Sequence, residues 1–102
     1  MRDIYAEALN RWGEQAQIMM LFEEMSELQQ AICKDYRAND YSTRNNIAEE
    51  IADVEIMLEQ MKELFDCHTH VSIQKNIKLK RLGETLDELK EQDGKAETYS
   101  KF

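Results

Sequence analysis

Two pairs of acidic residues in this chain have a spacing that can hold a metal ion. Glu24 and Glu27 form the first pair, and Glu50 and Asp53 form the second. Residues three apart are neighbours on one face of a helix, so two packed helices can bring four carboxylates around one point. Their repulsion in a partly buried site is relieved by a proton or by a cation. Ligands that offer only oxygen favour Mg²⁺, or Mn²⁺, over zinc and copper.

The residues around each pair indicate that the carboxylates face another helix. Steps of three and four residues define an α-helical seam on each side of the predicted site: Met20, Glu24, Glu27 and Ala31 in the first, and Glu50, Asp53, Met57, Gln60 and Leu64 in the second. Glu50 also lies beside the apolar residues Ile47, Ile51 and Val54, whereas a merely solubilising acid would lie opposite them. A single pair is expected by chance as a solvated pair among 21 acidic residues. Two pairs at matching positions favour a site.

Helices must position these acids, because the sequence favours no other element. The chain has no proline and three glycines, and it lacks the β-branched and aromatic clusters of strands. We predict an all-α four-helix bundle, with a single domain over residues 1–93 and a polar tail at 94–102. The predicted helices cover 2–11, 14–37, 44–65 and 71–91, with Gly13 as a break, Ser42 or Thr43 as one N-cap and Thr69 as another.

Apolar residues at helical spacing run along the second and third predicted helices as two apolar stripes. The first stripe contains Ile18, Leu21, Phe22, Met25, Leu28 and Ile32, and the second contains Ile47, Ile51, Val54, Leu58, Met61 and Phe65. The fourth helix repeats leucine at steps of three and four, as paired helices do. A chain of 102 residues covers so much apolar surface poorly by itself. We therefore expect a homo-oligomer, a dimer or a dimer of dimers.

Composition excludes several classes of partner. The net charge of −8 disfavours a nucleic acid polymer, whose phosphates require a basic surface. No apolar run is long enough to cross a membrane, and the first residues do not resemble a signal peptide. Cys33 and Cys67 are too few for a disulfide framework, so we expect a cytoplasmic protein. Cys67, His68 and His70 fall short of a four-ligand zinc pattern.

The acidic motifs resemble those of a known family. Residues 23–27 read E-E-x-x-E, residues 50–53 read E-x-x-D, and 22 residues separate Glu27 from Glu50. This pattern resembles the MazG-like all-α nucleoside triphosphate pyrophosphohydrolases, a group that includes helical dUTPases, dCTPase-like enzymes and phosphoribosyl-ATP pyrophosphohydrolase. The resemblance extends from about Trp12 to Arg81. It implies that Glu24, Glu27, Glu50 and Asp53 are the catalytic Mg²⁺ ligands and that Glu23 is an additional acid.

The resemblance also implies residues that bind the substrate. The segment from Asn76 to Arg81 is similar to a phosphate-contacting segment of the family, although Lys75, Lys78, Lys80 and Arg81 fit it in more than one register. Four cations in seven residues form a local anion site, or they balance nearby acids on the surface.

The segment that contains Trp12 and Gln17 also resembles the family, which implies that these two residues face the nucleotide. Ordinary core packing is the alternative for Trp12. The implied reaction converts a (d)NTP and water to a (d)NMP and pyrophosphate, with one of the acids activating the water. Phosphoribosyl-ATP as the substrate, or a non-enzymatic helical interaction protein, remain alternatives.

Overall fold

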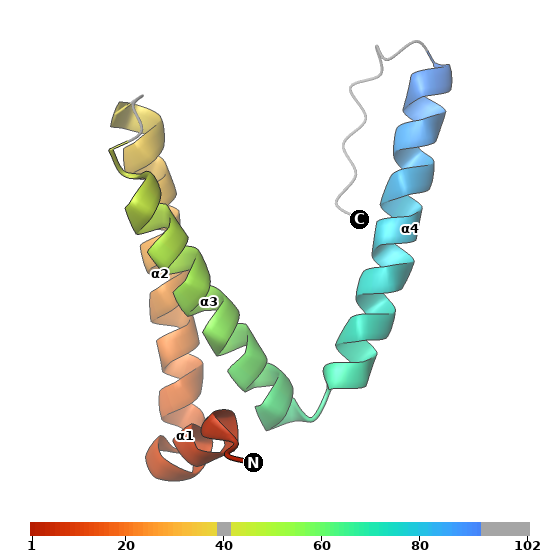
Figure 1. Ribbon diagram of the computed structural model, residues 1–102. Coiled ribbons are helices and arrows are strands. Elements are labelled where there is room, and N and C mark those ends of the chain that lie inside the picture. Colours follow the sequence, from red (N-terminus) through yellow and green to blue (C-terminus); the bar gives the residue numbers. More distant parts are fainter. Residues whose placement is uncertain (39–41, 93–102) are drawn as a thin grey trace. The chain divides into compact units, whose positions relative to one another are not determined.

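Helices are the only regular elements in the part of the chain that the computed structural model describes, residues 1–38 and 42–92. They are α1 (Ile4–Trp12), α2 (Glu14–Ala38), α3 (Arg44–Phe65) and α4 (His68–Glu91) (Figure 1). The all-α prediction is therefore confirmed, and the predicted tail at 94–102 lies outside the described residues. None of the described helices is long and apolar enough to span a membrane. The chain divides into two units, Met1–Asp66 and Cys67–Phe102, which are described separately.

Gly13 separates α1 from α2, as predicted. Its φ of 89° and ψ of 162° belong to a region that is essentially restricted to glycine. Asp3 begins α1 by accepting a hydrogen bond from the backbone N–H of Ala6, and the N–H of Gly13 closes the helix on the carbonyl of Leu9. The chain turns at Gly13, and α1 contacts both α2 and α3 near one end of the pair that they form (Figure 1).

Asp35 links the C-terminal end of α2 to the N-terminal end of α3. The hydroxyl of Thr43 donates to Asp35 Oδ1 at 2.5 Å, and Arg44 Nε lies 3.0 Å from the same oxygen. Thr43 stands at the N-cap position of α3, but its side chain makes no capping hydrogen bond. The N-cap position was therefore predicted correctly, but the side chain of Thr43 does not cap the helix, because its hydroxyl donates to Asp35.

The connection between α3 and α4 is shorter than the gap between the predicted helices 44–65 and 71–91. Asp66 ends α3 in the left-handed conformation, with φ of 51°, and its backbone N–H bonds to carbonyls of the last turn. The chain then enters α4 directly at His68, after Cys67 as the N-cap. The prediction that Thr69 caps this helix is therefore wrong, because Thr69 already lies in the first helical turn.

The core of the first unit follows the acidic seams and not the apolar stripes. The buried residues of the described chain are Gln17, Ala31, Met57 and Gln60. The last three are seam residues, and Gln17 extends the first seam, because it lies three residues before Met20. No residue of either apolar stripe is buried. The carboxylate-bearing faces of α2 and α3 therefore pack against each other.

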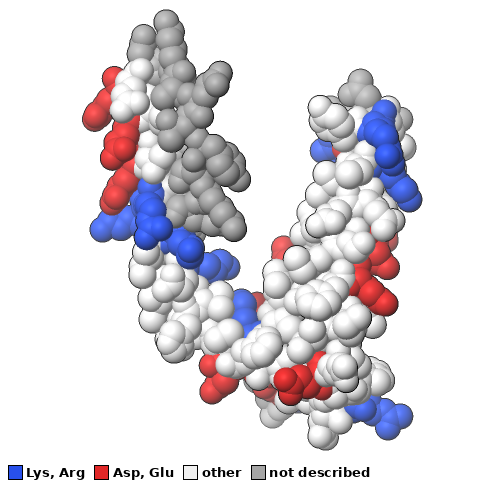
Figure 2. Space-filling model, turned by 180° about the vertical axis from the view of Figure 1, so that it is seen from behind, with Lys and Arg blue, Asp and Glu red and all other residues white. Residues whose placement is uncertain are grey.

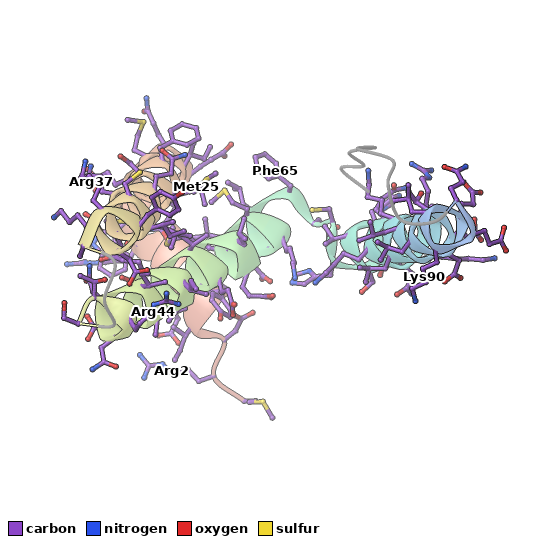
Figure 3. The ribbon with its side chains drawn as sticks, turned by 90° about the horizontal axis from the view of Figure 1, so that it is seen from above. Arg2, Met25, Arg37, Arg44, Phe65 and Lys90 are labelled. Carbon is purple, nitrogen blue, oxygen red and sulfur yellow. The ribbon has the colours of Figure 1, made fainter. Side chains whose placement is uncertain are left out.

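The two apolar stripes consequently lie on one side of the α2–α3 hairpin. Apart from Phe22, each stripe follows its seam by one residue, and the helices run antiparallel (Figure 1). The residue that follows a seam residue is rotated by about 100° around the helix axis. In an antiparallel pair this rotation places it on the same side of the pair for both helices. Phe22, Met25 and Ile32 of α2, with Ile51, Leu58 and Phe65 of α3, form this exposed apolar face. The ring of Phe65 projects away from the helix (Figure 3).

Candidate metal centre

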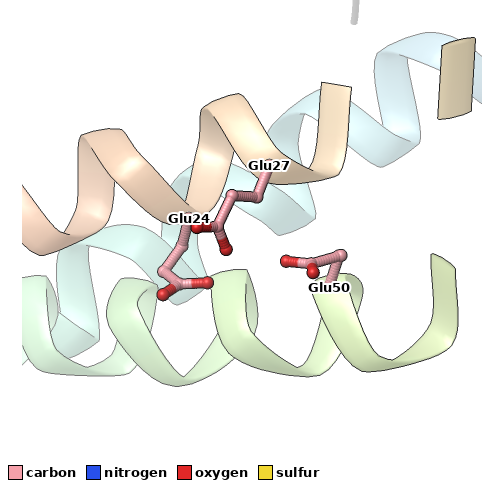
Figure 4. Close-up of side chains that lie close together, drawn as sticks. All are labelled: Glu24, Glu27 and Glu50. Carbon is pink, nitrogen blue, oxygen red and sulfur yellow. The ribbon is translucent and has the colours of Figure 1, made fainter. Parts of the chain in front are cut away.

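Three carboxylates converge in the space between α2 and α3. Glu24 and Glu27 come from adjacent turns of α2, and Glu50 comes from α3 (Figure 4). Each offers an oxygen that lies within 4.8 Å of an oxygen of the other two. Three of the four predicted metal ligands therefore come together from two helices, at the position that the spacing indicated.

Two oxygens of this cluster have no partner in the described protein. Glu24 Oε2 and Glu50 Oε2 are buried, and neither accepts a hydrogen bond there. Burial of a carboxylate oxygen without a donor is costly, since water cannot solvate it. A cation between the helices would satisfy both oxygens, so the donor set fits a hard metal ion.

The electrostatics of the cluster disfavour the ionised forms of two of its carboxylates. The pKa of Glu24 is raised from 4.5 to about 7, first by burial and then by the charges of Glu27, Asp53 and Glu50. Burial likewise raises the pKa of Glu50, followed by the charges of Glu27 and Asp53. The folded chain therefore takes up a proton here near neutral pH unless a cation replaces it.

Asp53, the fourth predicted ligand, lies outside the group of three. It is one turn beyond Glu50 on α3, and its side chain is exposed. Its charge nevertheless acts on both Glu24 and Glu50. Glu23, the additional acid of the first motif, is also exposed and is not part of the close group.

Trp12 and Gln17 lie in the wall of a pocket in the same unit. The pocket has a volume of about 400 Å³ and is lined by residues of all three helices: Ile4, Tyr5, Ala8, Trp12, Ala16, Gln17, Met20, Ile56, Met57 and Gln60. Trp12 is exposed and not packed in the core of this unit. Gln60 is a pocket residue that the motifs did not indicate. Its position on the same helical seam as Glu50 and Asp53 could have identified it from the sequence.

The predicted phosphate-binding residues belong to the second unit. Lys75, Asn76 and Arg81 are exposed on α4, and Lys78 is half-buried. Positive side chains gather over the middle of α4, and negative side chains gather toward its C-terminal end (Figure 2). Their contact with phosphate remains a prediction. Cys67, His68 and His70 form no close metal-ligand group among the described residues.

Comparison of the chain with protein-family models, with curated proteins and with solved structures found no match.

The raised pKa of Glu24 predicts how stability depends on pH. The folded state binds this proton more tightly than the unfolded state, whose pKa is near 4.5. The resulting stabilisation is complete below pH 4.5 and is lost as the pH rises through about 7. In the presence of a chelator, we expect the melting temperature to fall between pH 5 and pH 8.

Added Mg²⁺ should raise that melting temperature more at pH 8 than at pH 5, because the ion competes with the proton for the same carboxylates. Glu24→Gln should flatten the pH dependence in chelator, as measured by thermal unfolding. An unchanged slope in this variant would assign the pH dependence to other groups.

Proposed function

We propose that this protein is a Mg²⁺-dependent nucleoside triphosphate pyrophosphohydrolase of the MazG-like type. The observation that carries the proposal is the convergence of Glu24, Glu27 and Glu50, with two buried oxygens that lack donors. These oxygens lie on the seams that also contain the buried residues Ala31, Met57 and Gln60. The resemblance of the two acidic motifs supplies the reaction class.

In this proposal the residues of the chain have separate tasks. Glu24, Glu27 and Glu50 hold the ion, and Asp53 adds negative charge one turn away. When bound, Mg²⁺ neutralises charge on the phosphates and lowers the pKa of coordinated water. Water attacks the α-phosphorus, the bond to the oxygen that bridges the α- and β-phosphorus atoms breaks, and pyrophosphate leaves. A carboxylate of the cluster, or Glu23, accepts the proton of the water. The cations of α4 bind the phosphates.

The proposal is tested by the products of hydrolysis. Purified protein with Mg²⁺ is incubated with the common NTPs and dNTPs and with phosphoribosyl-ATP, and pyrophosphate and inorganic phosphate are measured separately. We expect pyrophosphate and the corresponding monophosphate from at least one substrate. Release of inorganic phosphate instead, or no turnover across the whole panel, would contradict the proposal.

The exposed apolar face favours a self-associating protein. Six large apolar side chains of the α2–α3 hairpin lie on this one face: Phe22, Met25, Ile32, Ile51, Leu58 and Phe65. A contiguous apolar face of this kind marks an interaction surface. It would also suit the alternative, a non-enzymatic interaction protein. That alternative leaves the two buried oxygens of Glu24 and Glu50 unexplained.

We expect the protein to be a dimer or tetramer at micromolar concentration, as measured by light scattering. Leu58→Asp should shift it to a smaller species, because a charge within the interface is desolvated without a partner. Gln30→Asp is the matched control, since Gln30 is exposed on α2 and lies on the side of the helix opposite the stripe. A monomeric wild-type protein would contradict this prediction.

A further inference from the structure

A row of four leucines runs along α4 without burial in the part of the chain that the structure describes. The leucine row consists of Leu79, Leu82, Leu86 and Leu89, at steps of three, four and three residues. No residue of α4 is buried, and Leu79 and Leu86 are 58% and 51% exposed. A helix gains most of its stability from the packing of its apolar face. The leucine row therefore requires a partner.

The spacing of the leucines identifies this partner as a second copy of α4. The steps of three, four and three read the same in both directions along the helix, so the row is symmetrical about residue 84. Two copies that lie antiparallel around a twofold axis at this point place Leu79 beside Leu89 of the other copy. The same axis places Leu82 beside Leu86 of the other copy. Every leucine of one row then faces a leucine of the other.

The charges of α4 favour the antiparallel orientation. The segment 75–81 carries four cations, and the segment 84–91 carries four acids and one lysine (Figure 2). In an antiparallel pair the basic segment of each helix runs beside the acidic segment of the other, whereas a parallel pair would align segments of like charge. Most of these side chains lie outside the leucine row, so they select the orientation while the leucines supply the buried surface.

Gly83 fits the centre of such a pair. It lies inside α4, where glycine disfavours the helix relative to alanine. Outside its own helical turn, no described atom lies within 4 Å of the position that a Cβ would take. The packing of the single chain therefore does not require a residue without a side chain here. Gly83 directly follows Leu82 beside the centre of the leucine row, where a missing side chain lets two helices approach closely.

We propose that α4 pairs antiparallel with α4 of a second copy through the leucine row, around a twofold axis beside Gly83. This interface is separate from the exposed apolar face of α2 and α3, which belongs to the other unit. Two interfaces that each join identical surfaces are what a dimer of dimers needs. The pairing does not depend on the proposed hydrolysis.

Cysteine cross-linking tests the pairing and its orientation. Leu79→Cys and Leu89→Cys are made as separate proteins in which Cys33 and Cys67 are replaced by serine. A thiol oxidant is added to each protein alone and to their mixture after subunit exchange. We expect a covalent dimer in the mixture and little in either protein alone. Two copies of one position lie about 15 Å apart along the axis of the antiparallel pair, which is too far for a disulfide.

Two results of the cross-linking would overturn the proposal. A covalent dimer of Leu79→Cys with itself would show a parallel pair. The absence of a covalent dimer from every sample would show that α4 does not pair. The cross-link should also persist when Leu58→Asp is added, because Leu58 lies on the separate face of α2 and α3. Its loss there would overturn α4 as an independent interface.

The second test introduces a charge into the leucine row. Leu82→Asp should lower the molar mass in solution by about a factor of two, because the partner helix would desolvate the carboxylate. Ile73→Asp is the matched control, since Ile73 is an exposed apolar residue on the side of α4 opposite the leucine row. Light scattering measures both masses. An unchanged mass for Leu82→Asp, or an equal decrease for Ile73→Asp, would contradict the pairing. The cysteine variants keep the row apolar, so their result does not depend on how aspartate affects the helix.

The outcomes separate this inference from the proposed function, since neither measurement uses a nucleotide. Pyrophosphate release without the cross-link would overturn the pairing and leave the proposed hydrolase intact. The cross-link without turnover of any nucleotide would support the pairing and contradict the hydrolase.

Discussion

Glu50→Gln is expected to reduce pyrophosphate release at least about 100-fold while the helical fold persists. The variant removes one of three converging carboxylates and with it a charged ligand of the proposed metal ion. A metal ion supplies several kcal/mol of charge stabilisation in the transition state, and each 1.36 kcal/mol is about tenfold in rate. Steady-state kinetics over a range of Mg²⁺ concentrations would measure the loss.

The same variant should be at least as stable as the wild-type protein when no metal is present. Burial and the neighbouring charges of Glu27 and Asp53 disfavour the ionised form of Glu50, which raises its pKa. Replacing the carboxylate by a neutral amide relieves that repulsion. Glu55→Gln is the control, because Glu55 is an exposed acid of the same helix. An unfolded Glu50→Gln protein, or one that retains full activity, would show that Glu50 is structural or dispensable.

Alanine at Lys75, Lys78 or Arg81 is expected to lower kcat/KM by about 10- to 150-fold. Each cation would form a charge-assisted hydrogen bond to phosphate, worth roughly 1.5–3 kcal/mol. Stability should change little at Lys75, because an exposed charge contributes little to folding. Activity assays on the three variants, combined with thermal unfolding, would separate the two effects.

The matched control for these variants is Lys90→Ala. Lys90 is an exposed cation of the same helix, near its C-terminal end. Lys62 of α3 is a less suitable control, because its Nζ lies 2.7 Å from Glu59 Oε1 and its side chain is only 22% exposed. Its replacement would therefore also remove an ion pair. If alanine at Lys75, Lys78 and Arg81 lowers kcat/KM no more than alanine at Lys90, the phosphate-binding assignment is wrong. The proposed metal centre would be unaffected by that result.

An interaction protein would behave differently in the same experiments. It should show no nucleotide-dependent effect of any basic substitution, and its association should change when Leu82 or Leu86 of α4 is replaced. Leu86 is exposed and Leu82 is half-buried on this helix. The pairing of α4 predicts the same change in association for an enzyme, so turnover of nucleotides is the measurement that distinguishes the two functions.

Local chemistry was sufficient to predict the helices. Helical periodicity and the absence of proline depend only on neighbouring residues, so the long helices α2 and α3 were predicted with nearly correct ends. The break at Gly13 was equally local, since its backbone conformation excludes other residues. The cap at Thr43 was less predictable, because its hydroxyl had a competing partner, Asp35, on another helix.

The carboxylate cluster was predictable because its geometry is mostly helical geometry. A separation of three residues makes Glu24 and Glu27 neighbours on any helix, and the short connection to α3 makes an antiparallel pair the natural arrangement. The same reasoning placed Asp53 with the others. The structure leaves it exposed and outside the close group, because the distance across two helices depends on their packing and not on spacing.

Helical periodicity established which residues share a face, and the two acidic pairs predicted that the seams face another helix, whereas packing decided how far the apolar stripes are covered. Each of α2 and α3 carries an acidic seam beside an apolar stripe, and periodicity alone does not choose between them. Packing buried Ala31, Met57 and Gln60 on the seams and left every residue of the stripes half-buried or exposed. The pocket also required α1 to turn back at Gly13, since its wall joins residues from three helices. The burial of Gln60 has the same origin, because its Nε2 donates to the backbone carbonyl of Tyr5, 55 residues earlier in the chain.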